Sequence, residues 1–249
     1  MGRTTRAVAW LGVFAAIVAA WASLYAGARM SGVDWVGRPV GPNMMPMETM
    51  GALFPMWTVM MAAMMLPVMV PALVTYEALI RSADGSRAGW LGVLCGYLGA
   101  WIGFAALVSA AQVGLLRLGL LDGLGAASSA WLAAALLLAV GLYQFGRTKA
   151  VCHGVCLAPM QYYLGRWRPG AFGGLRMGLG LGGFCVGCCW GFMALGFVGG
   201  VMSLLWMGAA TVLMVLEKLE PVGRHVARPI GAALIAAGAA VAARAAGLV

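Results

Sequence analysis

Hydrophobic residues occur along this chain in long runs that short polar segments separate. The runs are about 20 residues long, which is the length of a helix that crosses a lipid bilayer. None shows the strict alternation of a β-strand. Because lipid cannot satisfy backbone polar groups, such runs predict α-helices. We predict a single all-α integral membrane domain, residues 1–249, built as a polytopic bundle of about seven spans at 8–26, 54–80, 89–113, 130–145, 174–198, 201–217 and 229–246.

Composition and charge agree with a membrane protein. Of 249 residues, 63% are hydrophobic and 9% are charged, whereas soluble domains carry roughly 25% charged residues. The net charge of +9 lies between the apolar runs without an aromatic-rich patch, so nucleic-acid binding is not expected. Most lysines and arginines face one side if the N-terminus is cytoplasmic, which predicts a bacterial inner-membrane protein with its C-terminus outside. The first run also fits a cleaved signal peptide, although its length favours a retained span.

More than half of the eighteen methionines lie between residues 44 and 69. Helical spacing places Met56, Met60 and Met64 on one face of the second predicted span, with Met61 and Met65 on an adjoining stripe. Thioethers are soft ligands that suit Cu(I), but methionine is also an ordinary filler of helix interfaces. Four more methionines fall in the predicted outer loop, at Met44, Met45, Met47 and Met50.

Two prolines, Pro67 and Pro71, stand in the same span. Each removes one backbone donor and frees a carbonyl one turn earlier. The sequence leaves two interpretations open: a kink that opens space for a ligand, or a kink that only shapes packing.

The fifth predicted span carries Cys185, Cys188 and Cys189, whose spacing places three thiols on one helix face. A thiolate in hydrocarbon is costly unless a cation compensates it, so the cluster favours a soft metal ion over simple packing. Glycines four residues apart on this span predict close approach of another helix. We expect that neighbour to be the second span, which would bring methionines and cysteines together.

A third group of candidate ligands lies in the predicted inner loop, residues 146–173. It consists of Cys152, His153 and Cys156, and the C-x3-C spacing with an internal histidine is a moderate metal signal. The predicted topology adds His225 and three glutamates on the same side. These glutamates are Glu77, Glu217 and Glu220. The plainer interpretation of Glu217 and Glu220 is pairing with Lys218 and with arginines at the helix ends.

Several function classes lack their residues. The predicted spans hold almost no ionisable groups, which disfavours proton-driven transport. No phosphate-binding glycine loop and no hydrolase constellation is found, so an enzyme is not expected, apart from a thiol-redox role.

The chain resembles a bacterial family described only as predicted metal-binding integral membrane proteins, a family whose domain has no known function. The specific stretch is Cys185-Val186-Gly187-Cys188-Cys189-Trp190. The resemblance covers about residues 54–221 and implies metal binding at Cys152, Cys156 and the three clustered cysteines, and less securely at the methionines. A histidine often precedes the cysteine run in that family, and its absence here disfavours zinc. The other matching stretches are 60–67, 143–156, 167–170, 176–179, 199–202 and 217–218.

The leading hypothesis from sequence is a Cu(I)-binding membrane protein for copper transport or delivery, with a membrane or metallochaperone protein as a possible partner. The first alternative is a transmembrane thiol–disulfide electron relay, because Cys185 and Cys188 have redox-pair spacing. The second is a structural subunit that anchors a membrane complex. An electron relay would require the cysteines but not the methionines. In a structural anchor, loss of the sulfur residues would affect assembly of the complex but not metal handling.

Overall fold

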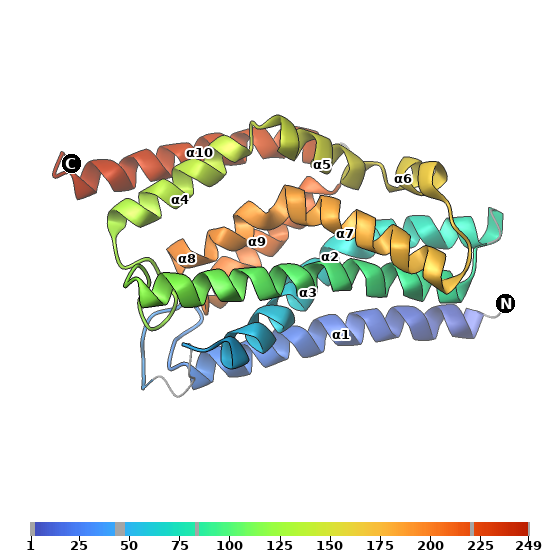
Figure 1. Cartoon of the computed structure of the whole chain (residues 1–249), viewed down its shortest axis with the longest axis horizontal. Helices are drawn as coiled ribbons and strands as arrows, with labels where there is room; N and C mark the ends of the chain where they lie inside the picture. Colours follow the sequence, from blue (N-terminus) through green and yellow to red (C-terminus); the bar gives the residue numbers. More distant parts are fainter. Residues whose placement is uncertain (1–2, 43–47, 83–84, 220–221, 249) are drawn as a thin grey trace.

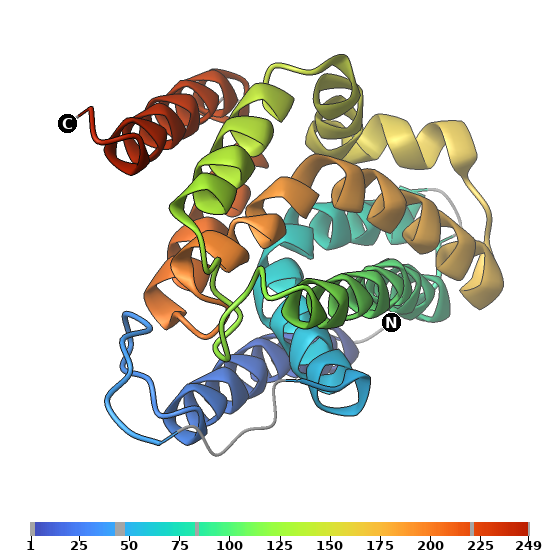
Figure 2. The same ribbon diagram turned by 60° about the vertical axis from the view of Figure 1, so that its left-hand side comes forward.

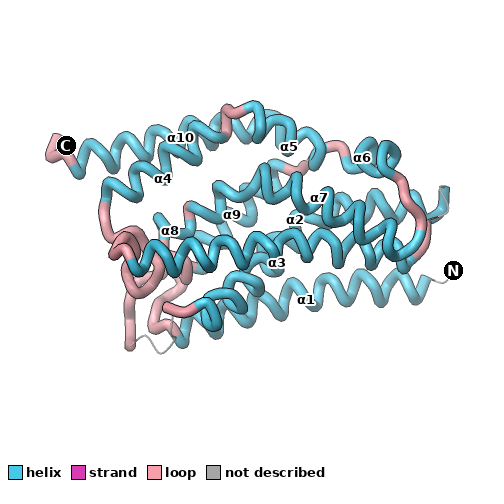
Figure 3. Tube along the Cα trace, viewed as in Figure 1, coloured by secondary structure: helices cyan, strands magenta, loops and turns pink. Residues whose placement is uncertain are grey.

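The computed structural model describes residues 3–42, 48–82, 85–219 and 222–248. All secondary-structure elements in this part of the chain are helices (Figure 3). Five helices are long and apolar enough to cross a membrane, or six if one bent pair counts as a single span. The all-helical prediction is therefore confirmed, whereas seven full spans are not. The helices are α1 (Arg3–Met30), α2 (Met50–Ser82), α3 (Arg87–Arg117), α4 (Ala130–Tyr143), α5 (Arg147–Leu157), α6 (Pro159–Arg166), α7 (Gly170–Ala194), α8 (Gly196–Gly199), α9 (Leu204–Glu217) and α10 (Val222–Ala245).

The long helices run side by side along the longest axis, and the two ends of the chain lie at opposite ends of the bundle (Figure 1). A turned view shows α3 and α7 near the centre, with α1 and α10 on opposite flanks (Figure 2). The predicted span 201–217 is only the 14-residue helix α9, which is shorter than a usual crossing. Gly200, between α8 and α9, adopts a φ of +87°, a backbone conformation that glycine takes without strain, and so allows the turn between these two helices.

The segment expected to be an inner loop is largely helical. Helix α4 ends at Tyr143, and α5 begins at Arg147 after a bend of 62°. Gly146, the N-cap of α5, has an extended backbone that interrupts the helix between them. Pro159 then starts α6, because proline suits the first turn of a helix. As a result, Cys152 and Cys156 lie one turn apart on α5 rather than on a loop.

The glycines of α7 do allow a close neighbour, but the main neighbour is α3 rather than α2. A Cβ on Gly178 would meet the carbonyl oxygen of Val93 at 2.2 Å, and one on Gly96 would meet that of Leu175 at 2.1 Å. Only glycine lets the two backbones come this near. Helix α3 thus fixes α7, and with it the clustered cysteines. The expectation that the second and fifth spans form the principal helix pair is wrong.

Helix α2 continues through Pro67 and Pro71 from Met50 to Ser82. The carbonyl of Ala63, which Pro67 leaves without its helical donor, accepts a hydrogen bond of 3.1 Å from the indole of Trp21 on α1. This freed carbonyl therefore joins α1 to α2. The structure supports a packing role for Pro67, not a ligand-lining one.

Candidate metal centre

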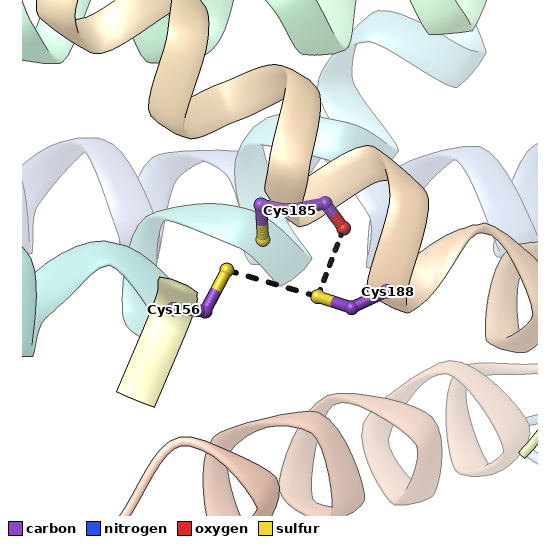
Figure 4. A group of neighbouring side chains, drawn as sticks. All are labelled: Cys156, Cys185 and Cys188. Atoms are coloured by element: carbon purple, nitrogen blue, oxygen red, sulfur yellow. Dashed lines mark hydrogen bonds between the residues drawn. The ribbon is translucent and has the colours of Figure 1, made fainter. Parts of the chain in front are cut away.

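Three thiols from two helices meet at the centre of the bundle. Cys185 and Cys188 project from α7 and Cys156 from α5, and their Sγ atoms all lie within 4.8 Å of one another (Figure 4). The Cys156 and Cys188 sulfurs are 3.8 Å apart. All three cysteines are free, and both α7 members are buried. We call Cys156, Cys185 and Cys188 the thiol site.

Two neighbours shape one side of this site. Cys189 is fully buried, with its Sγ 3.4 Å from that of Cys188 and 4.0 Å from that of Cys185. It does not belong to the group of mutually close sulfurs, so the convergent set is three rather than four. The hydroxyl of Tyr97 on α3 lies 3.0 Å from the Cys185 Sγ. Helix α3 thus holds the orientation of Cys185 by a polar contact as well as by packing.

Positive charge stands directly against the sulfurs. Lys218, the C-cap of α9, places its Nζ 2.8 Å from the Cys188 Sγ and is buried. An ammonium group this close to a thiol favours the thiolate, which is the form that binds metal.

A buried ion pair joins the helices that form the site. Lys149 of α5 and Glu217 of α9 meet at 2.7 Å, with side chains 2% and 0% exposed. Lys149 also donates to the carbonyl of Cys188 at 2.7 Å and lies 5.2 Å from the Phe192 ring centroid. This single ammonium group therefore ties α5, α7 and α9 together around the thiols.

The other predicted ligands on α5 lie beside the thiol site. His153 is buried, and its Nε2 is 2.6 Å from the backbone oxygen of Glu217, so this nitrogen is engaged with protein. Cys152 is half-buried and packs on Gly187, where an added Cβ would lie 2.7 Å from its Sγ. Of the predicted C-x3-C pair, only Cys156 belongs to the thiol site.

The methionines of α2 from Met56 to Met69 are buried in the same hydrophobic core as the cysteines. The backbone of α2 passes behind the thiol site (Figure 4). Among the described residues no hydrogen bond joins a methionine to a cysteine. Met44, Met45 and Met47 lie outside the described residues, and Met50 is exposed at the start of α2. The buried methionines predicted as ligands are Met60, Met61, Met64 and Met65.

Two of the three glutamates predicted on the inner side, Glu77 and Glu217, form ion pairs. Glu77 pairs with Arg87 and Arg6 at the end of the bundle, away from the cysteines. Glu217 pairs with Lys149 instead of Lys218, while Glu220 lies outside the described residues and His225 is exposed.

Sequence reasoning assigned Lys149 and Lys218 to loop charge and did not consider Tyr97. The signal for the two lysines was their place inside stretches that carry the family resemblance.

One family model matches the chain: PpoB2, described as a copper chaperone, over residues 54–241. No curated protein and no solved structure matches. Because the matched region is most of the 249 residues, the chain belongs to this copper chaperone family. The match supports a metal- and copper-related family, but not the specific family of predicted metal-binding membrane proteins that the sequence resembles.

Proposed function

We propose that this member of the PpoB2 copper chaperone family is an integral membrane protein that carries Cu(I) as cargo at the thiol site and passes it to a partner. The observation that supports this proposal most directly is the meeting of Cys156, Cys185 and Cys188 within 4.8 Å. Helices of membrane-spanning length place that site inside an apolar bundle.

The donor set favours Cu(I) over zinc. Structural zinc almost always takes four tetrahedral ligands, usually with nitrogen or a fourth sulfur. Here three sulfurs converge, Cys189 stands apart from Cys156, and the His153 Nε2 is occupied by the Glu217 carbonyl. Thiolates are soft ligands and suit Cu(I), which accepts low coordination numbers.

Positive charge next to the sulfurs offsets part of the charge of a bound copper–thiolate group. Three thiolates with Cu(I) carry a net charge of −2, and the ammonium of Lys218, 2.8 Å from the Cys188 Sγ, offsets one of these charges. A buried charge is tolerated only when it is paired. Lys149 does not add to this balance, because Glu217 neutralises it.

The division of the ligands between two elements supports delivery rather than permanent storage. Two ligands lie on α7, which packs against α3. The third ligand lies on the short helix α5. A bend of 62° divides α5, the helix that carries this third ligand, from α4. A small movement of α5 would therefore remove one ligand and weaken the hold on copper.

The test is anaerobic titration of the purified full chain with Cu(I) against a colorimetric Cu(I) chelator. We expect one tightly bound Cu(I) per chain, and a loss of affinity of at least tenfold in each of C156A, C185A and C188A. The matched control is C95A, because Cys95 is an exposed free cysteine on α3. Equal affinity in the triple alanine variant and C95A would overturn the proposal.

The electron-relay alternative predicts a different result. It requires a disulfide that forms and breaks reversibly during turnover. A relay would show oxidation of two thiols to one disulfide in air and no stoichiometric Cu(I) binding under anaerobic conditions.

A further inference from the structure

A second feature lies next to the thiol site, at the end of the bundle where α6 meets the start of α7. It is a pocket of about 670 Å³, within the range of about 300–1,000 Å³ that is usual for small-molecule sites. Three arginines line it: Arg166, Arg168 and Arg176. The described lining residues include no carboxylate. The pocket therefore offers concentrated positive charge to an anion.

The pocket is open to solvent but has an aromatic inner wall. All three arginines are exposed. The guanidinium of Arg166 lies 4.9 Å from the Tyr162 ring centroid and 5.7 Å from that of Phe184. These stacking contacts restrain a long, flexible side chain, so at least one charge is held in place over the wall. Tyr162 is buried, and its hydroxyl donates to the carbonyl of Met177.

The wall of the pocket leads directly to the metal ligands. Gly180 and Phe184 line the pocket, and Cys188 follows at the same spacing of four residues on α7. Residues four apart on a helix share one face, so Cys188 lies one turn beyond Phe184 on that face. Cys156 precedes the other wall, since α5 ends at Leu157 and α6 carries Tyr162. Helix α7 thus continues from the thiols into the pocket, and α6, which follows α5 in the chain, supplies part of the other wall.

We propose that this arginine-lined pocket docks a small anionic Cu(I)–thiolate complex and that copper exchanges between this carrier and Cys188 past Phe184. The inference rests on the proposed function, because it names the form in which copper reaches or leaves the thiol site. Cu(I) is bound by soft thiolates wherever they are present, and a small thiol that carries carboxylates makes its copper complex anionic.

The exchange is balanced without an oxidant. One Cu–S bond to the carrier breaks as one Cu–S bond to Cys188 forms, and copper stays Cu(I) throughout. Cys188 reacts as the thiolate that Lys218 favours, and the carrier sulfur leaves as a thiolate, so charge is conserved. The arginines touch no reacting atom; they concentrate and orient the anion, which changes the rate and not the final affinity.

The experiment compares transfer rates in the full chain, purified in a neutral detergent without phospholipid. The probes are Cu(I) complexed by reduced glutathione, which is anionic, and Cu(I)–acetonitrile, which is cationic. The test variant is R166Q/R168Q/R176Q. The matched control, R29Q/R38Q/R117Q, removes the same charge from exposed arginines outside the pocket. Copper–thiolate absorption is followed after rapid anaerobic mixing.

We expect the pocket variant to slow transfer from the glutathione complex about tenfold or more at low salt. This difference should shrink as salt screens the charges. Transfer from Cu(I)–acetonitrile and the final amount of bound copper should stay unchanged, and the control variant should match the wild type. Equal rates in the two variants, or an equal slowing with both probes, would overturn the docking role. Failure of the wild type to bind copper from either probe would instead overturn the proposed function.

Discussion

Removal of the Lys149 ammonium should damage both the fold and the thiol site. In K149M, Glu217 keeps its carboxylate in a position that is 0% exposed and loses its ion-pair partner, and its Oε1 already lacks a described hydrogen-bond partner. Breaking a buried pair in this way costs about 3–5 kcal/mol. For a chain of this size that corresponds to a fall of about 10 °C in the apparent Tm.

A double-mutant cycle with E217Q isolates the pair. E217Q leaves the Lys149 charge with the Cys188 carbonyl and the Phe192 ring, so it should cost less than K149M. K149M/E217Q leaves no unpaired charge and should be more stable than K149M alone.

Thermal unfolding of the copper-free protein in detergent measures all three variants against wild type. Cu(I) titration should show weaker binding in K149M, because Cys156 lies on the helix that Lys149 anchors. A double variant no more stable than K149M would refute the reasoning.

Three further predictions follow from single contacts. G96A should lower the apparent Tm, because its Cβ would meet the Leu175 carbonyl at 2.1 Å, whereas G103A on the same helix has open space and should be neutral or slightly stabilising in the same thermal scan. K218M should weaken Cu(I) binding roughly 10–100-fold in chelator competition, since a hydrogen bond to a charged group contributes about 1.5–3 kcal/mol. K218R keeps the positive charge and should retain most of the affinity. An equal loss of affinity in both variants would contradict the charge argument. Replacement of four buried methionines by leucine should keep one Cu(I) per chain, because three thiols already form a complete set; loss of copper on elemental analysis would place thioethers among the ligands. The four are Met60, Met61, Met64 and Met65.

The membrane-length helices could be predicted from sequence because their signal is local: about twenty apolar residues decide a helix without reference to the rest of the chain. The break near Gly146 was harder to place, because polar residues after Phe145 fit a loop as well as a bent helix. The structure shows a bent helix pair, because α5 follows α4 after the break. Helical spacing also gave Cys185 and Cys188 their shared face, which the structure confirms.

The third thiol and its charged neighbours could not be derived in this way. Spacing along one helix says nothing about which segment comes to meet it, and here Cys156 reaches Cys188 across 32 positions of sequence. The pairing of α7 with α3 was equally out of reach. Small residues predict that a neighbour comes close, but glycines on both α3 and α7 had to be matched to identify it.

The buried lysines change how positive charge in this chain is understood. Lys149 and Lys218 belong to the excess that predicts orientation, yet both are buried against the cysteines of α7. A lysine buried in an apolar bundle is expensive unless it has a partner. Lys149 pairs with Glu217, whereas Lys218 has the Cys188 sulfur as its polar partner among the described contacts. The cost of burying Lys218 is offset only if that sulfur carries negative charge. The same condition that makes the thiol site able to bind Cu(I) therefore makes this lysine tolerable in the core.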